Sequence, residues 1–182
     1  VDFITMIEEA QKDDIVIRLE YTIGNYVFAS TPILTFWKES AIEIDELKYL
    51  SLISIRRKQT EVQDIEFSIN KLVEVAIRSI GHYDPKTATN VIYQIGEILA
   101  SISRESIFSN YLKDESNKLR IILQKREFNH YLYHGFGYIR HYAKDNVIVS
   151  TEIIKVLDLM AHSLNTRDYK AVWEFGLFTA SG

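Results

Sequence analysis

The chain has 182 residues, of which 47% are hydrophobic and 25% charged, a balance that is typical of a globular protein and excludes a disordered or fibrous one. Seven Gly and two Pro make up about 5% of the chain, against about 12% in average proteins, so long helices are favoured over an all-β sandwich. The net charge of −4 and the pI near 5.8 argue against a nucleic-acid-binding domain. Cysteine is absent, which excludes disulfides, thiolate nucleophiles and Cys-based metal sites.

Hydropathy gives no sign of a membrane span. No stretch of the sequence approaches the 18 or so consecutive apolar residues that a spanning helix requires. The sequence starts at Val1 without an initiator Met or a signal-peptide pattern. We therefore expect a soluble piece of a longer protein.

Residues 1–42 predict a small β unit with a leading helix. Asp2 is a suitable N-cap for that helix. Three short strands are expected after it, at 15–20, 26–28 and 33–37, from alternating apolar residues separated by Gly, Asn and Pro turn signals. Such a sheet is too small to be stable alone and must pack on helices. Acidic residues concentrate here, with eight acidic and three basic residues among residues 1–43.

Residues 43–182 predict an α-helical domain, because the apolar period changes from 2 to 3.6. A first helix follows Asp45. Thr60 and Gln63 form a capping-box pattern that opens a second helix, which runs to Ile80 and around which we expect the domain to be built. Its apolar stripe comprises Val62, Ile65, Ile69, Leu72, Val73, Ala76, Ile77 and Ile80.

The opposite face of that helix is mixed, since Phe67 and Val75 interrupt its charged residues. We therefore expect part of this face to be covered as well. A covered charge needs a partner, so we expect Asp64 to be buried in a polar pocket near the turn at 81–85. The other residues expected to line that pocket are Arg57, Arg78, Asp84 and Thr87.

The remaining elements follow from caps and apolar spacing. Asp84 and Pro85 open a helix that runs to about Ser103. Residues 119–123 fit either a strand or a helix, and we favour the strand. Three more helices are expected at 128–143, 147–164 and about 167–178, the first interrupted by Gly135 and Gly137. The predicted fold class is mainly α with a small β part (α+β).

A run of polar residues carries a family resemblance. The segments are Arg57-x-x-Thr60-x-x-Gln63-Asp64, Leu72-Val73-x-x-Ala76-x-Arg78 and Asp84-Pro85-x-Thr87-Ala88, followed later by Ile139-Arg140-x-Tyr142-Ala143. This pattern resembles that of a bacterial family of predicted membrane proteins of unknown function, DUF2254. The chain differs at Tyr83, where the family pattern has Asn.

The resemblance implies a location and no activity. It implies a membrane region that this sequence lacks and a module attached by it to the bacterial inner membrane, on the cytoplasmic face. Candidate ligand-binding residues carried by the pattern are Arg57, Gln63, Asp64, Arg78, Asp84, Thr87 and Arg140.

Three histidines are the candidate metal ligands. On an uninterrupted helix, His134 and His141 are rotated from His130 by only about 40° and 20°, and an i, i+4 pair of histidines is a known zinc spacing. However, no Glu stands beside His130, and the three residues span about 16 Å of helix. Ordinary surface or hydrogen-bonded histidines are therefore the preferred interpretation, and the metal site is the alternative.

No Gly-rich phosphate loop, nucleophile elbow or paired-carboxylate motif is present. We therefore expect a non-enzymatic domain without a cofactor, which binds a partner subunit or a small ligand and no nucleic acid. Homo-oligomer formation is left open. The alternative is an enzyme that uses the polar pattern residues or a His-bound metal.

Overall fold

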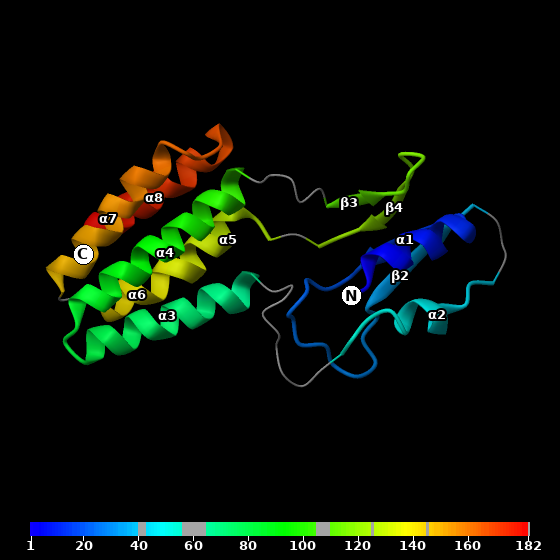
Figure 1. The fold of residues 1–182 in the computed structure, drawn as a ribbon, viewed down its shortest axis with the longest axis horizontal. Coiled ribbons are helices and arrows are strands. Elements are labelled where there is room, and N and C mark those ends of the chain that lie inside the picture. The colour runs from blue at the N-terminus through cyan, green and yellow to red at the C-terminus, as the bar shows by residue number, and fades with distance from the viewer. Residues whose placement is uncertain (40–42, 56–64, 105–109, 125, 145, 182) are drawn as a thin grey trace. The chain divides into compact units, whose positions relative to one another are not determined.

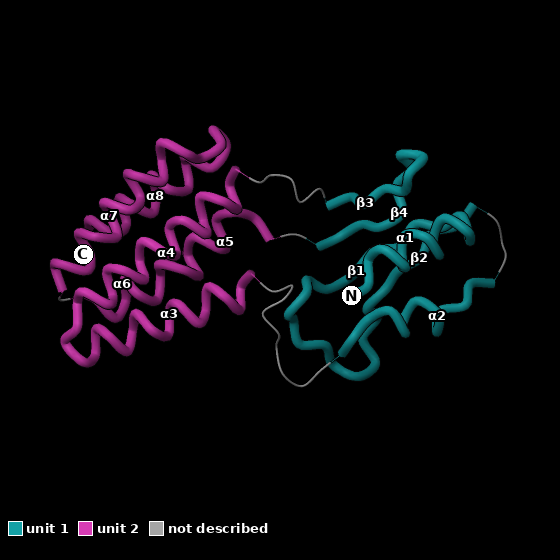
Figure 2. The backbone as a smooth tube through the Cα atoms, viewed as in Figure 1, with its two compact units in different colours: residues 1–60, 109–125 teal, residues 61–108, 126–182 magenta. Residues whose placement is uncertain are grey.

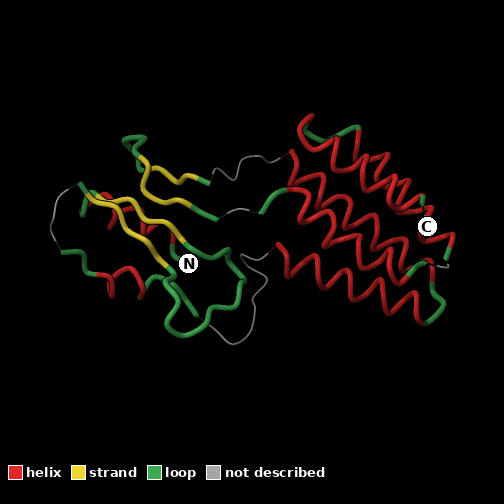
Figure 3. Tube along the Cα trace, turned by 180° about the vertical axis from the view of Figure 1, so that it is seen from behind, coloured by secondary structure: helices red, strands yellow, loops and turns green. Residues whose placement is uncertain are grey.

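The computed structural model describes residues 1–182 except 40–42, 56–64, 105–109, 125, 145 and 182 (Figure 1). Most described residues are helical and one small mixed sheet is present, which confirms the α+β fold class. The chain forms two compact units: residues 1–60 with 109–125, and residues 61–108 with 126–182 (Figure 2). The sheet belongs to the first unit, and the second is built from helices (Figure 3).

The sheet of the first unit has four strands: β1 (Ile15–Leu19), β2 (Leu34–Lys38), β3 (Tyr111–Lys113) and β4 (Leu119–Ile122). Their order is β2-β1-β4-β3. β1 pairs antiparallel with β2 and parallel with β4, and β3 pairs antiparallel with β4. Two of the four strands thus come from residues 109–125, within the range that the sequence placed in the helical domain.

The strand expected at 119–123 is confirmed as β4, and the strand expected at 26–28 is wrong. Residues between β1 and β2 form turns, in which Gly24 and Ser30 both have positive φ. Tyr26 and Phe28 are 82% and 78% exposed, so this alternating segment has no buried face against which to pack. β1 pairs instead with the next apolar segment, in which Leu34 lies opposite Leu19.

Two helices cover the core of the first unit. α1 (Phe3–Lys12) is capped by Asp2, as expected, and α2 (Glu46–Leu50) is capped by Asp45. The core that they share with the sheet comprises Met6, Ala10, Ile15, Ile17, Leu19, Tyr49 and Ile121.

A buried arginine joins the segments of this unit. Arg120 is 5% exposed, and its Nε lies 2.7 Å from Asp114 Oδ2 while its Nη1 lies 2.8 Å from Asp14 Oδ1. The guanidinium also donates to the carbonyls of Ala10 and Ile15, each at 3.4 Å. The hydrogen bond from Arg120 holds the pKa of Asp114 below its ordinary value. One guanidinium on β4 thereby forms hydrogen bonds with the end of α1, the start of β1 and the β3–β4 turn.

The second unit consists of α3 (Ile65–Gly81), α4 (Pro85–Arg104), α5 (Phe128–Leu132), α6 (Tyr138–Tyr142), α7 (Val147–Ala161) and α8 (Tyr169–Ala180). A π-helical turn, η1 (Tyr133–Gly137), joins α5 to α6, and a 3₁₀ turn, η2 (Thr166–Asp168), precedes α8. More residues are buried on α4 than on any other helix, so α4 rather than α3 is central by burial. The expected apolar stripe of α3 packs inward, with Ile69, Val73 and Ala76 buried.

The second face of α3 is more exposed than the sequence predicts. Val75 is 43% exposed, and the side chain of Arg78 is 77% exposed, 4.0 Å from Glu74. Lys71 lies over the Phe67 ring, with its Nζ 5.3 Å from the ring centroid. The polar residues of this face are therefore largely solvated along the described length of the helix.

The Arg120 network predicts a large loss of stability on truncation. Arg120→Ala leaves Asp114 buried beside no cation, and should lower the free energy of unfolding of the first unit by about 3–5 kcal/mol. Urea unfolding followed by tryptophan fluorescence measures this loss in a chain that also carries Trp173→Phe. Its remaining tryptophan, Trp37, then reports on the first unit alone. The control is Lys118→Ala, whose exposed amine lies 3.7 Å from Asp14 and should contribute about 1 kcal/mol or less. A loss below 1 kcal/mol for Arg120→Ala would contradict the assignment.

Candidate metal centre

Two pairs of polar side chains, each spaced i, i+4, face each other inside the helical unit. Glu66 and Asn70 lie on α3, His130 lies on α5 and His134 lies in η1. Glu66 Oε2 is 3.4 Å from His130 Nε2, and Glu66 Oε1 is 3.9 Å from His134 Nε2. The ligand atoms of these three residues all lie within 4.8 Å of one another. His134 Nε2 also donates a hydrogen bond to Asn70 Oδ1, at 2.5 Å.

These side chains are half-buried. The exposed fractions of the Glu66, His130 and His134 side chains are 25%, 33% and 20%. The two imidazoles stack, with ring centroids 5.6 Å apart and planes 16° from parallel, so both present an Nε2 to the same carboxylate. His130 Nε2 is shielded from solvent and makes no hydrogen bond to a described residue. This buried nitrogen therefore has no hydrogen bond within the described chain that a ligand would have to replace.

An arginine neutralises this carboxylate in the structure. Arg126 Nε lies 3.0 Å from Glu66 Oε2, the same oxygen that faces His130. A guanidinium this close stabilises ionised Glu66 and opposes a second cation at the same oxygen. Any metal ion bound here must compete with Arg126 for Glu66.

The π turn explains which histidines come together. An i→i+5 turn takes one residue more than an α turn. Beyond η1, His141 is therefore rotated by about 80° from His130, instead of the about 20° expected on a regular helix. His141 is exposed on α6 and is not part of the cluster, because the helix is interrupted and the shared face of an uninterrupted helix does not apply to it.

The described candidate residues make other contacts, and the expected pocket around Asp64 stays a prediction. Asp84 Oδ1 accepts from the backbone N–H of Thr87 at 3.1 Å, so this pair is the N-cap of α4. The Arg140 guanidinium carbon lies 3.6 Å from the centroid of the Phe178 ring, and its Nη2 donates to the Phe178 carbonyl, which joins α6 to α8. No hydrogen bond or ion pair between described residues links Arg78 or Arg140 to that cap. Arg57, Gln63 and Asp64 lie outside the described residues.

Sequence reasoning missed three members of the cluster: Glu66, Asn70 and Arg126. A signal for the first two exists, because they stand four residues apart, next to the apolar stripe positions Ile65 and Ile69. Nothing local distinguishes Arg126, which reaches Glu66 because η1 and α6, further along the same segment, pack against α3.

The donor set fits a transition-metal ion. Imidazole nitrogens and carboxylate oxygens bind zinc at about 2.0–2.2 Å, which places tetrahedral donor atoms roughly 3.3 Å apart. His130 Nε2 lies 3.4 Å from Glu66 Oε2 and His134 Nε2 lies 3.9 Å from Glu66 Oε1, so these contacts use different carboxylate oxygens and the donors would have to draw closer around a metal ion. The His134 ring must give up the proton on Nε2, and Asn70 Oδ1 then becomes free to act as a fourth oxygen donor.

Glycine allows the helix that carries the histidines to approach α4. A Cβ on Gly135 would lie 2.8 Å from Ile95 Cγ2, and Ile95 is fully buried. Gly135→Ala should therefore destabilise the helical unit by about 1–3 kcal/mol through overpacking. Thermal melting followed by helical circular dichroism measures the loss.

Gly137→Ala is the matched control, because it lies in the same π turn and a Cβ there would meet nothing within 4 Å. It should leave the melting temperature unchanged or raise it, since Ala favours helix by up to about 1 kcal/mol. Equal destabilisation by both substitutions would show that the π turn, and not the approach to Ile95, is sensitive.

Comparison with known proteins gives a family. The chain is 25% identical over 113 residues to uncharacterised proteins of Mycobacterium bovis (Mb1321c) and Mycobacterium tuberculosis (Rv1290c), a match that covers 61% of this chain and 22% of each relative. No solved structure matches significantly. Within the described residues, no helix combines the length and the apolar character that crossing a bilayer requires. The model of the predicted membrane protein family DUF2254 matches residues 1–158, and the chain therefore belongs to that family.

Proposed function

We propose that the helical unit binds one divalent transition-metal ion between Glu66, His130 and His134. The observation that carries this proposal is the convergence of three ligand atoms, from two separate helical segments, within 4.8 Å. The sequence alone favours ordinary histidines here, and a His-bound metal is its alternative interpretation. The proposal draws on two of the three histidines singled out there and adds a carboxylate.

The donor chemistry selects the class of ion. Mg²⁺ and Ca²⁺ prefer six or more oxygen donors, whereas two imidazoles suit Zn²⁺, Ni²⁺, Cu²⁺ or Fe²⁺. With no cysteine in the chain, histidine supplies the softest donors available. We therefore expect Zn²⁺ to bind much more tightly than Mg²⁺.

Arg126 sets the affinity of this site. Glu66 is paired with Arg126 in the structure, and metal binding would exchange the guanidinium for the ion. The Arg126 side chain is 31% exposed, so it can turn toward solvent when Glu66 rebinds. Removing Arg126 distinguishes a metal site from a purely structural ion pair. It should raise the metal affinity of a metal site, whereas it would raise no metal affinity if the pair is only structural.

The placement of the unit in the cell is a further part of the proposal. The family is described as predicted membrane proteins, and the chain covers 22% of the length of its mycobacterial relatives. We propose that the whole protein is anchored in the bacterial inner membrane and that the metal-binding unit lies on the cytoplasmic face. The absence of cysteine is compatible with that reducing compartment.

Isothermal titration tests the metal site on the untagged, metal-free chain. Zn²⁺ should bind with a stoichiometry of one, and Mg²⁺ should give no heat at the same concentration. His130→Ala and His134→Ala should each weaken Zn²⁺ binding by more than about 100-fold, beyond the 10–100-fold typical of outer-shell partners. His141→Ala is the control, because it removes an exposed imidazole outside the cluster and should leave the affinity unchanged.

Arg126→Gln should change the Zn²⁺ affinity in the opposite direction to the two histidine substitutions. Removing the competing guanidinium should tighten Zn²⁺ binding several-fold, while Lys144→Gln, which removes an exposed cation elsewhere in the unit, should not. The proposal fails if the wild-type chain binds no Zn²⁺ at micromolar concentrations, or if His141→Ala weakens binding as much as His130→Ala does.

A further inference from the structure

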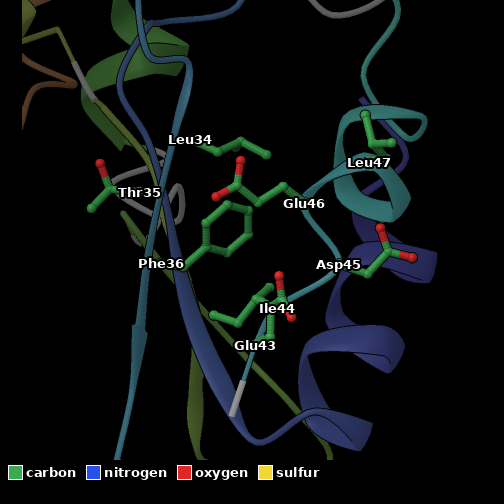
Figure 4. Close-up of a pocket in the computed structure, with 8 residues that line it drawn as sticks. All are labelled: Leu34, Thr35, Phe36, Glu43, Ile44, Asp45, Glu46 and Leu47. Carbon is green, nitrogen blue, oxygen red and sulfur yellow. The ribbon is translucent and has the colours of Figure 1, made fainter. Parts of the chain in front are cut away.

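A groove runs beside the edge of the sheet in the first unit (Figure 4). It has a volume of about 970 Å³, and its two walls are β2 and the segment that leads into α2. The eight residues that line it are Leu34, Thr35, Phe36, Glu43, Ile44, Asp45, Glu46 and Leu47. Nothing in the family description or in the relatives accounts for this feature.

The groove has an apolar floor. Leu34, Phe36 and Ile44 are half-buried and pack against the core of the unit. The Phe36 ring packs against the ring of Tyr49, with ring centroids 5.4 Å apart. In Figure 4 the side chains of Leu34, Phe36 and Ile44 all point into the space between the two walls. A ligand that fills the groove would therefore remove more apolar surface from water.

The rim of the groove carries uncompensated negative charge. Glu43 and Glu46 are exposed, and neither makes a hydrogen bond or an ion pair with another described residue. The Glu46 side chain reaches across the groove toward β2 (Figure 4). Asp45 is already used, because its Oδ1 accepts from the Lys48 N–H at the start of α2. Two carboxylates thus remain to attract a cationic ligand.

The neighbouring strand has an unpaired edge. β2 is the first strand in the order β2-β1-β4-β3, and within the described chain its other side pairs with no strand. Edge strands present N–H and C=O groups that an extended segment can join. Apolar floor, acidic rim and open edge therefore favour the same kind of ligand.

We propose that this groove binds an extended segment of a partner protein that carries both apolar residues and Lys or Arg. The apolar side chains would cover Leu34, Phe36 and Ile44, and the cationic ends would reach Glu43 and Glu46. Lys and Arg suit this geometry because their aliphatic stems lie on apolar surface while the charged heads stay in water. The proposal does not depend on the metal site, which belongs to the other unit.

NMR of the ¹⁵N-labelled chain tests it without metal. The probe is a capped ten-residue peptide in which Leu or Val alternates with Lys, and the matched peptide has Glu in place of Lys. The Lys peptide should shift the amide signals of residues 34–36 and 43–47, and the Glu peptide should not. The double variant Glu43→Lys/Glu46→Lys should weaken Lys-peptide binding by about tenfold or more.

The control variant is Glu8→Lys/Glu115→Lys, which makes the same change in net charge at two exposed positions of the same unit. Its affinity for the Lys peptide should stay within about twofold of wild type. Equal weakening by both double variants, binding of the Glu peptide, or an absence of localised shifts at millimolar peptide would overturn the proposal. The proposal would also be overturned if sedimentation showed that the chain self-associates and that Glu43→Lys/Glu46→Lys abolishes this self-association, because a second copy would then occupy the groove.

Discussion

The Glu66 carboxylate ties together the segments of the helical unit that carry the candidate metal ligands. It lies between a guanidinium and two stacked imidazoles, and through them connects α3 to the segment that runs from Arg126 into η1. One carboxylate cannot serve Arg126 and a metal ion through the same oxygen without cost. The balance between these two partners decides whether the site is a structural ion pair or a ligand site, and single substitutions shift it in predictable directions.

A second constraint is the π turn between α5 and α6. The turn keeps His130 and His134 stacked on the side of Glu66 while it rotates the rest of the helix, His141 included, away from that side. Gly135 allows the turn to lie directly against Ile95 on the most buried helix of the unit. Helix irregularities of this kind are frequent at functional sites. In this unit, one irregularity separates His141 from the stacked His130 and His134 and brings Gly135 against the core.

The regular elements were predictable where local signals agree. Asp2 and Asp84 do cap the helices that follow them, and the apolar stripe of α3 is inward as the 3.6-residue period requires. The strand expected at 26–28 failed because strand pairing is decided by a partner, and β1 pairs with residues 34–38 instead.

The candidate site was only partly predictable, for a similar reason. The spacing of His130 and His134 is local and could be read from the sequence, whereas Glu66 and Arg126 reach them only through tertiary packing. The separation of His141 from the other two histidines has one local cause, since a single extra residue in η1 changes the helical phase of everything after it. In the first unit, Arg120 stands in an ambiguous apolar run; its partner Asp114 lies in the adjoining β3–β4 turn, but its other partner, Asp14, is 106 residues away.

X-ray absorption at the zinc edge identifies the ligands of the chain loaded with one equivalent of Zn²⁺. We expect two imidazole nitrogens in the first coordination shell at about 2.0–2.1 Å, with oxygen donors completing it. The imidazole contribution should fall to one in His134→Ala and stay at two in His141→Ala. A first shell of oxygen alone, or one that loses an imidazole in His141→Ala, would contradict the assignment of Glu66, His130 and His134 as the metal ligands.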